Sequence, residues 1–290
     1  MKCSKFGNIL VTIVLYKKRL KKSETFISLE KSTLHILEFI DLFIYDNSPE
    51  PQEVEPTEYI NIIYLHDPKN PGVSKAYNTA CEKAEALNKE WVLIFDQDTT
   101  LPLEVIDAYS KAIFEIKPEI NIISPKLFSG GKMISPCKYI LHRGFPIAKI
   151  SAGNSQIKGY SFLNSGLLLR TEFMRKIGFF DERLFDYSDH DFIFRSAKDN
   201  QIAKIIDLEL EHGFSSHALA DEDRAVQRFI MLARASSYMS KKYHSPFPIL
   251  WLIARSFKLF VYTKDASYIK IALTEGLGIP FGIFSNQESA

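Results

Sequence analysis

The sequence predicts an α/β fold with a mostly parallel central sheet, helices on both faces and a C-terminal helical appendage. Strand-like and helical patterns alternate four times over the first 125 residues, which is typical of a parallel sheet covered by helices. The run Trp91 to Phe95 is apolar throughout, as in a strand buried on both faces. After Asp221 the pattern changes to helical spacing.

The first half supplies the alternating elements. Ile9 to Tyr16 is rich in Val and Ile and predicts a buried strand. Ser23 and Glu24 favour a helix start, and Ser32-Thr33 is a candidate break in that helix. Residues 49–59 are polar and proline-rich and predict a surface loop. Further strands are expected at 41–46, 61–65, 91–95 and 122–125, and further helices from 73 to about 88 and from about 102 to 116.

The pattern then becomes irregular. Residues 126–160 predict hairpins or loops, and 162–170 is apolar again around Asn164-Ser165-Gly166. An isolated Gly in a strand often allows a backbone or ligand to approach closely, which makes Gly166 a candidate binding residue. A helix near 189–197 and a strand at 205–210 follow. We expect a catalytic domain over 1–220, with a nucleotide-binding half 1–125 and an acceptor half 126–220, and a helical region over 221–290.

Composition excludes some classes of function. The 290 residues carry a net charge of +1, so there is no general argument for nucleic-acid binding. Three separated cysteines, Cys3, Cys81 and Cys137, fit a reducing cytoplasm better than a disulfide framework. The apolar run 9–15 is too short to span a bilayer and lacks a small-residue cleavage pattern, so we interpret it as the first strand.

Two carboxylates, Asp96 and Asp98, directly follow the apolar strand 91–95. Buried carboxylates are costly unless a cation or hydrogen-bond donors meet them, and a hard cation such as Mg²⁺ or Mn²⁺ carrying a phosphorylated substrate is the obvious candidate. The alternative is a strand followed by a solvated acidic turn. Asp46 also ends a predicted strand, and ligands of such sheets lie beyond the carboxyl ends of the strands, so the three carboxylates are expected to converge.

A second acidic cluster lies at the start of the predicted helix 189–197. One of Asp186, Asp189 and Asp191 is expected to cap that helix. Arg195 follows Asp191 by four residues and can pair with it, which leaves Asp189 as the better candidate general base. His212 follows a strand beside Gly and Ser, where it can contact a metal or a phosphate, although a lone histidine is more often a packed residue.

These pieces, in this order, resemble the family 2 glycosyltransferases, and within them the rhamnosyltransferase-like branch. The resemblance covers roughly residues 8–216 and depends on the ordered set of motifs. The set comprises Leu15-Tyr16, Asp46-Asn47-Ser48, Asn70-Pro71-Gly72 with Asn78, Asp96-Gln97-Asp98, Asn164-Ser165-Gly166, Gly178-Phe179-Phe180-Asp181-Glu182, and Asp189-His190-Asp191 with Arg195.

The resemblance implies the Rossmann-like, A-type glycosyltransferase fold and a role for each site residue. It implies that a nucleotide-diphosphate sugar is bound by Tyr16, Asp46, Asn78, Asp96 and Gly166, and that Asp98 and His212 hold Mg²⁺ or Mn²⁺. Asp189 matches the catalytic base, but Ser188 stands where many relatives carry Glu, which leaves the base open between Asp189 and Asp191.

The function expected from these roles is transfer of one sugar, with inversion, to a hydroxyl of a glycan or lipid-linked acceptor in surface polysaccharide synthesis. L-rhamnose from a dTDP donor is the candidate sugar. Processive relatives carry Gln-x-x-Arg-Trp, and neither Trp91 nor Trp251 follows an arginine. The alternatives are a catalytically inactive sugar-nucleotide-binding relative and a sugar nucleotidyltransferase, although residues 16–20 are not the Gly-rich phosphate loop of the latter.

The apolar and basic stretch 241–262 leaves two interpretations open. It suits an interfacial helix beside anionic lipid, at the inner face of the membrane, where a lipid-linked acceptor would be. It equally suits a helical hairpin packed on the catalytic domain.

Overall fold

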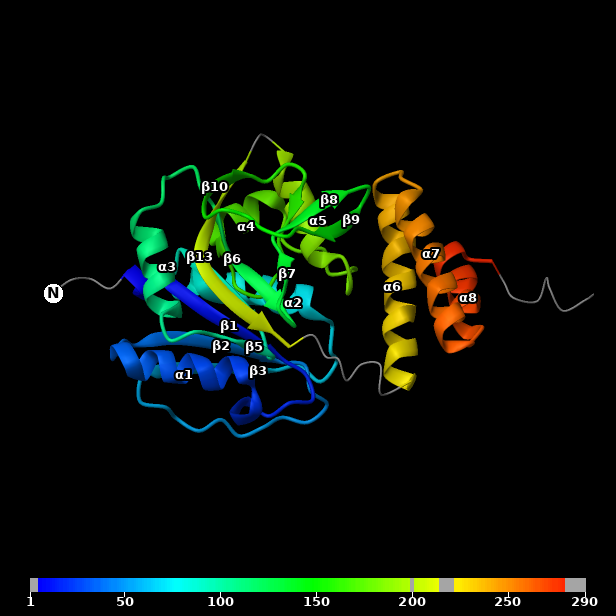
Figure 1. Cartoon of the computed structure of the whole chain (residues 1–290). Coiled ribbons are helices and arrows are strands. Elements are labelled where there is room, and N and C mark those ends of the chain that lie inside the picture. Colours follow the sequence, from blue (N-terminus) through cyan, green and yellow to red (C-terminus); the bar gives the residue numbers. More distant parts are fainter. Residues whose placement is uncertain (1–4, 199–200, 214–221, 280–290) are drawn as a thin grey trace, which may run out of the picture. The chain divides into compact units, whose positions relative to one another are not determined.

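The computed structural model describes residues 5–198, 201–213 and 222–279. The chain divides into two compact units (Figure 1). Unit 1 contains Met1–Tyr139, Gly144–Glu182 and Ser188–Phe214, and unit 2 contains Ile140–Arg143, Arg183–Tyr187 and Ser215–Ala290. The tip of one hairpin and the segment before residue 188 therefore group with the C-terminal helices.

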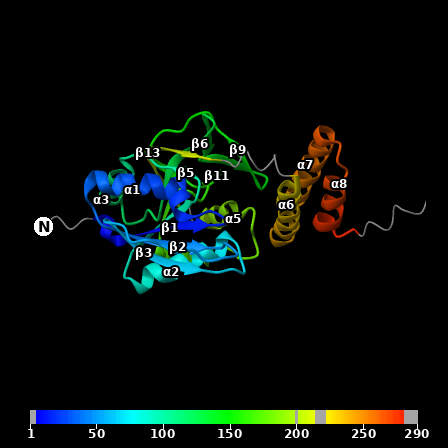
Figure 2. The same ribbon diagram turned by 90° about the horizontal axis from the view of Figure 1, so that it is seen from below.

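Unit 1 is built on a ten-stranded sheet with helices on both faces (Figures 1 and 2). Its longer strands are β1 (Ile9–Leu15), β2 (Ile40–Asp46), β3 (Ile60–His66), β4 (Trp91–Asp96), β6 (Ile122–Ser129), β12 (Leu167–Arg170) and β13 (Ile202–His212). The short strands of this sheet are β5 (Thr99–Thr100), β7 (Lys132–Ser135) and β10 (Gly153–Gln156), and a separate small sheet joins β8 (Cys137–Ile140), β9 (Arg143–Pro146) and β11 (Tyr160–Ser161). The helices are α1 (Glu24–Ile36), α2 (Val73–Ala86), α3 (Val105–Phe114), α4 (Thr171–Ile177) and α5 (Ser188–Ser196).

The main path of the sheet runs β10-β13-β6-β12-β4-β1-β2-β3. Parallel pairing joins β1 to β2 and β4, β2 to β3, and β6 to β13, whereas β12 lies antiparallel between β4 and β6. β1, β2, β3, β4, β6 and β13 consequently share one direction. Their carboxyl ends meet at one edge, which is where ligands bind in such sheets.

Alternation along β1 separates two cores, because successive side chains of a strand point to opposite faces. Ile9, Val11, Ile13 and Leu15 belong to one apolar cluster with side chains of α1 and α3. Leu10 and Val14 belong to the other, with side chains of α2, α4 and α5. A strand that packs on both faces is mostly apolar, and all seven residues of β1 are buried, with Thr12 as its one polar residue.

The predicted elements of unit 1 are confirmed, with three differences. The helix for which Ser32-Thr33 was a candidate break is continuous; the Thr33 hydroxyl donates back to the Glu30 carbonyl, and the Ser32 hydroxyl donates to the Leu103 carbonyl. β13 is longer than the expected 205–210 and includes His212 as its last residue. The short helix α4 was not predicted, since seven residues carry too little periodicity to identify one.

Unit 2 contains the helices α6 (Glu222–Lys242), α7 (Phe247–Thr263) and α8 (Ser267–Ile271), followed by a π-helical turn over Ala272–Gly276. Phe229, Leu252 and Tyr268 form its own apolar core. No helix in the described ranges is both long enough and apolar enough to cross a membrane.

Candidate active site

The acidic end of β4 and the end of β13 meet at the carboxyl edge of the sheet. β13 pairs antiparallel with β5, which places His212 opposite Thr99 and beside the turn that carries the two carboxylates. His212 Nε2 lies 4.0 Å from Asp96 Oδ2, and His212 Nδ1 lies 3.6 Å from Asp98 Oδ1. One candidate ligand atom from each of the three residues lies within 4.8 Å of the other two.

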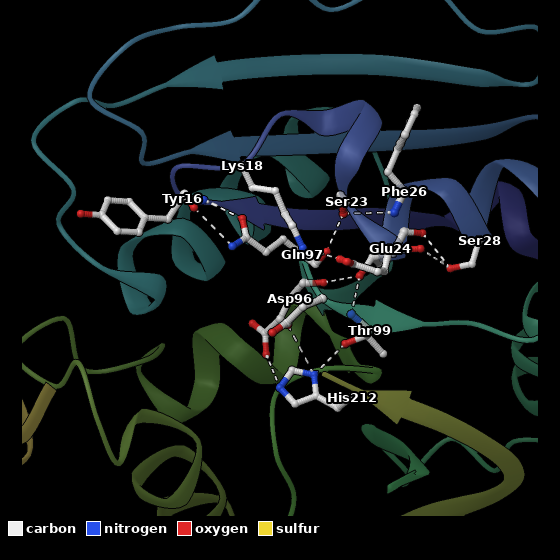
Figure 3. A network of polar contacts seen from close by, with 12 residues as sticks. Tyr16, Lys18, Ser23, Glu24, Phe26, Ser28, Asp96, Gln97, Thr99 and His212 are labelled. Carbon is white, nitrogen blue, oxygen red and sulfur yellow. Dashed lines mark hydrogen bonds and ion pairs between the residues drawn. The ribbon is translucent and has the colours of Figure 1, made fainter. Parts of the chain in front are cut away.

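Hydroxyl groups connect these residues, and Figure 3 shows the contact between Thr99 and His212. Ser165 Oγ accepts a hydrogen bond of 3.1 Å from the Asp96 backbone N–H and lies 2.6 Å from Thr99 Oγ1. Thr99 Oγ1 in turn lies 2.9 Å from His212 Nδ1. If Nδ1 donates to Thr99, the imidazole lone pair is on Nε2, the nitrogen that faces Asp96. A histidine that binds a metal is commonly held in this way through its other nitrogen.

Both carboxylates have perturbed acidity. Burial raises the pKa of Asp96, which the neighbouring His212 opposes and the Asp98 carboxylate reinforces. Burial also raises the pKa of Asp98, and the nearby His212 and Lys18 oppose that rise. Two acidic groups whose charged forms are disfavoured in the same place gain from a cation between them.

The donor set fits a divalent cation. Two carboxylates and one imidazole, converging from two strand ends, match the oxygen and nitrogen ligands that Mn²⁺ accepts, and the carboxylates suit Mg²⁺ equally. The relay from Ser165 through Thr99 supplies the outer support that orients the histidine. The residues that would hold the ion are therefore Asp96, Asp98 and His212.

Tyr16 and Lys18 border the carboxylates on the β1 side (Figure 3). The Gln97 side chain accepts from the Tyr16 backbone N–H at 2.8 Å and donates to its carbonyl at 3.3 Å, which fixes Tyr16 beside the acidic turn while its ring remains 43% exposed. The Lys18 ammonium pairs with Glu24. The Tyr16 ring is therefore held beside the acidic turn and partly open to solvent.

Asp189 and Asp191 have different surroundings on α5. Asp191 is 0% exposed, and its carboxylate accepts a 2.9 Å bond from Arg195 Nε. Arg195 also donates to the carbonyls of Ile177 and Phe179, so the pair ties α5 to the end of α4. The Asp189 side chain is 18% exposed and accepts from the His190 backbone N–H at 2.7 Å.

Asp189 lies within electrostatic range of Asp96, one of the candidate metal ligands, because the charge of Asp189 contributes to raising the pKa of Asp96. The Tyr77 hydroxyl donates to Asp96 Oδ1 at 3.1 Å, and Asn164 donates to Ser188, the residue before Asp189, at 3.5 Å. Asp189 is therefore the acidic residue of α5 that acts on the end of β4.

Three residues that were predicted to bind the donor are already in contact with other groups of the protein. Asp46 is 0% exposed and accepts from the Ser48 N–H, the Gln52 amide and the Tyr64 hydroxyl. Asn78 binds the backbone of Phe180 and the Glu182 carboxylate. A direct contact of Asp46 or Asn78 with a ligand requires these bonds to be exchanged.

The third is Gly166, and the atoms that approach it closely belong to the protein itself. Its φ is +85°, and a Cβ atom at this position would lie 2.6 Å from Pro125 Cγ and 2.7 Å from Leu210 Cδ1. Packing between β12, β6 and β13 thus accounts for the glycine.

Several residues of the site were not identified from the sequence. Gln97, Thr99, Ser165 and Tyr77 all act by orienting another site residue, and such polar residues are common in any chain. Two signals were available: Gln97 and Ser165 lie inside the motifs Asp96-Gln97-Asp98 and Asn164-Ser165-Gly166.

No protein-family model matches this chain, and no curated protein matches it. Solved structures do. S. aureus TarS is similar at 18% identity and a TM-score of 0.50, over 78% of this chain and 39% of that one. S. aureus TarS 1-349 in complex with UDP-GlcNAc is similar at 14% identity and a TM-score of 0.50, over 94% of this chain and 93% of that one.

The chain thus spans well under half of the longer TarS chain that it matches. Identities this low demonstrate the fold alone. The fold is a mixed α/β architecture with a mostly parallel central sheet flanked by helices, followed by C-terminal helices, as in TarS. This confirms the predicted fold class.

Proposed function

We propose that this protein is a metal-dependent, inverting glycosyltransferase that moves one sugar from a nucleotide-diphosphate donor to an acceptor hydroxyl. The observation that carries the proposal is the convergence of Asp96, Asp98 and His212 at the carboxyl edge of the sheet, with Asp189 in electrostatic range. A cation site for a diphosphate and a nearby carboxylate base are the two parts that such a transfer needs. We assign this chemistry to unit 1.

On the donor side, Asp96, Asp98 and His212 would hold Mg²⁺ or Mn²⁺, with Tyr16 lining the nucleoside. When bound, the ion would offset the negative charge that grows on the diphosphate as it leaves. Gln97 keeps the Tyr16 backbone in place, and Thr99 keeps the His212 ring in place. Contacts that fix these groups in place reduce the ordering needed at the moment of reaction.

On the acceptor side, Asp189 would accept the proton of the attacking hydroxyl. The acceptor oxygen then forms a bond to the anomeric carbon while the bond from that carbon to the diphosphate oxygen breaks. Attack from the face opposite the leaving group inverts the anomeric centre, and the nucleoside diphosphate leaves with the bonding electron pair. Between the two candidates for the base we choose Asp189, because Asp191 is buried and committed to Arg195.

The identities of the donor and the acceptor are also proposals. The complex of TarS with UDP-GlcNAc supports a nucleotide sugar as the donor class. L-rhamnose from dTDP remains our candidate from the sequence resemblance, so the two nucleotides form separate arms of the test. We propose a glycan or a lipid-linked saccharide as the acceptor, and a cytoplasmic location at the inner face of the membrane.

The test is a thermal-shift screen of UDP and dTDP sugars with Mn²⁺, followed by donor turnover with the best binder. A ligand bound by the folded state alone raises the unfolding temperature. We expect a shift that Asp98→Ala abolishes, whereas Glu119→Ala, which changes an exposed residue in the turn between α3 and β6, retains it. Binding without turnover by the wild type would identify an inactive sugar-nucleotide-binding relative, and no binding by any donor would contradict the proposal.

A further inference from the structure

Helix α7 is apolar on two opposite faces. One face, with Pro248, Leu252 and Ser256, is buried, and Leu252 belongs to the core of unit 2. Leu250, Ile253, Phe257 and Val261 are 52%, 41%, 62% and 48% exposed. Their spacings of three, four and four residues place them in one row along the helix. We call these four side chains the α7 row.

The row is unusual for a surface helix. A helix that packs on a core ordinarily presents charged and polar residues to water on its other side. Contiguous exposed apolar side chains on a soluble protein generally mark a surface for a protein or a membrane. The row therefore requires an occupant, and the charges around it indicate which kind.

The charges of α7 are all positive. The helix contains Arg255 and Lys258, both exposed, and has no Asp or Glu among its seventeen residues. By helical geometry Lys258 flanks one side of the row, and its ammonium lies 5.9 Å from the centre of the Tyr262 ring. Apolar residues beside cations and an amphipathic aromatic ring suit the boundary between headgroups and acyl chains.

Two acidic residues of unit 2 are already occupied. Asp265, just after the helix, accepts hydrogen bonds from the Ser267 N–H and hydroxyl. Glu275 accepts a 2.8 Å bond from Arg234. Lys264 and Lys270 add two exposed positive charges to the same end of unit 2. The field around the α7 row thus favours an anionic partner.

We propose that the α7 row docks on an anionic lipid bilayer, with α7 lying in the plane of the interface. Seventeen residues extend roughly 25 Å, and the row runs from residue 250 to residue 261 of this helix, so a helix parallel to the surface buries all four side chains together. Lys258 then meets the lipid phosphates. The inference deepens the membrane location within the proposed function, but it depends on unit 2 alone, and its test does not use transfer.

The experiment is flotation of the full-length protein with vesicles of phosphatidylcholine, with and without phosphatidylglycerol. We expect the wild type to float with the anionic vesicles and to be released by high salt, since the cations contribute through screened charge. Phe257→Ser and Lys258→Glu should each reduce the bound fraction at least about fivefold, through lost apolar burial and reversed charge respectively.

The control variant is Phe114→Ser in α3 of unit 1, a phenylalanine that is 72% exposed. It should float like the wild type, and unfolding curves should show that all three variants are folded. Equal flotation by Phe257→Ser and Phe114→Ser would overturn the proposal, as would a wild type that ignores both vesicles. A dimer in solution that Phe257→Ser dissociates would assign the row to a second copy and also overturn it.

Discussion

Asp189 and Asp191 are two residues apart on α5 and do different work. Asp191 is sealed from water and bonded to Arg195, whose guanidinium holds two carbonyls at the end of α4. Asp189 is in contact with solvent and with the site. At the scale of single residues, burial thus separates the structural carboxylate from the candidate base, although the two side chains are chemically identical.

This difference gives a pair of opposite expectations. Asp189→Asn should reduce the turnover number by about 10²–10⁴ with donor binding unchanged, because only the proton acceptor is lost. Asp191→Asn should lower the free energy of unfolding by about 1–3 kcal/mol, because the partly buried Arg195 loses a charged partner. Steady-state kinetics and urea unfolding measure the two effects. Full turnover by Asp189→Asn would exclude it as the base.

The raised pKa values of Asp96 and Asp98 predict a pH dependence of metal binding. Mn²⁺ binds the ionised carboxylates, so the rise in unfolding temperature that it produces should be large at about pH 8 and should vanish towards about pH 4. Without metal, the stability of the protein should change with pH in the opposite direction. Stability from these groups is present when they are protonated and is lost as the pH rises through their raised pKa values.

Asp98→Asn should remove most of the Mn²⁺ shift at every pH. The matched control is Asp207→Asn, an exposed carboxylate paired with Lys126, which should leave the Mn²⁺ shift intact. Calorimetric melts with Mn²⁺ and with a chelator measure both. A Mn²⁺ shift that does not depend on pH would place the ion elsewhere.

At the scale of elements, the site depends on how β12 and β13 approach β4. Ser165, which lies just before β12, accepts a hydrogen bond from the Asp96 backbone N–H, and β13 places His212 opposite Thr99. Gly166 allows this approach, because Pro125 and Leu210 occupy the space that a side chain would need. The glycine thus serves the site through packing between strands.

Replacing Gly166 should therefore be costly. Gly166→Ala should destabilise the protein by about 2–4 kcal/mol, from the left-handed backbone and from the overpacked Cβ together. Gly178→Ala is the control, since Gly178 has a φ of +90° but no atom within 4 Å of its Cβ position, and only the backbone cost of about 1–2 kcal/mol should remain. Urea unfolding distinguishes the two. Equal losses would show that packing at Gly166 is unimportant.

At the scale of the whole molecule, each apolar cluster lies inside one unit. The two cores on the faces of the sheet contain residues of unit 1 alone, and the core around Leu252 contains residues of unit 2 alone. Unit 1 also contains every residue of the candidate site. The units are therefore expected to lose stability separately.

Leu252→Ala should destabilise unit 2 by about 2–5 kcal/mol through the cavity it leaves. The Mn²⁺ response of unit 1 should persist in this variant. Leu168→Ala in β12, which is equally buried in the core of unit 1, should weaken that response together with the fold. Calorimetry with and without Mn²⁺ measures both. Loss of the Mn²⁺ response in Leu252→Ala would show that the units fold as one.

The order of the first strands and helices could be predicted from the sequence, because it depends on local patterns. Apolar runs such as 9–15, and the acidic turn that follows Trp91 to Phe95, are continuous in the chain. The surroundings of Asp46 and Asn78 were not accessible. Both have hydrogen-bonding partners that lie in other elements or loops, and no spacing in the chain encodes that their polar groups are already satisfied.

The sequence by itself determined the α/β fold class, the acidic end of β4, and the pairing of Asp191 with Arg195, because each depends on neighbours within a few residues. The tertiary structure decided that His212 meets Asp96 and Asp98, that Ser165 and Thr99 support it, and that Gly166 serves packing. The physical reason is distance along the chain: these groups are separated by tens of residues, and only the antiparallel β12 and the pairing of β13 with β5 bring them together.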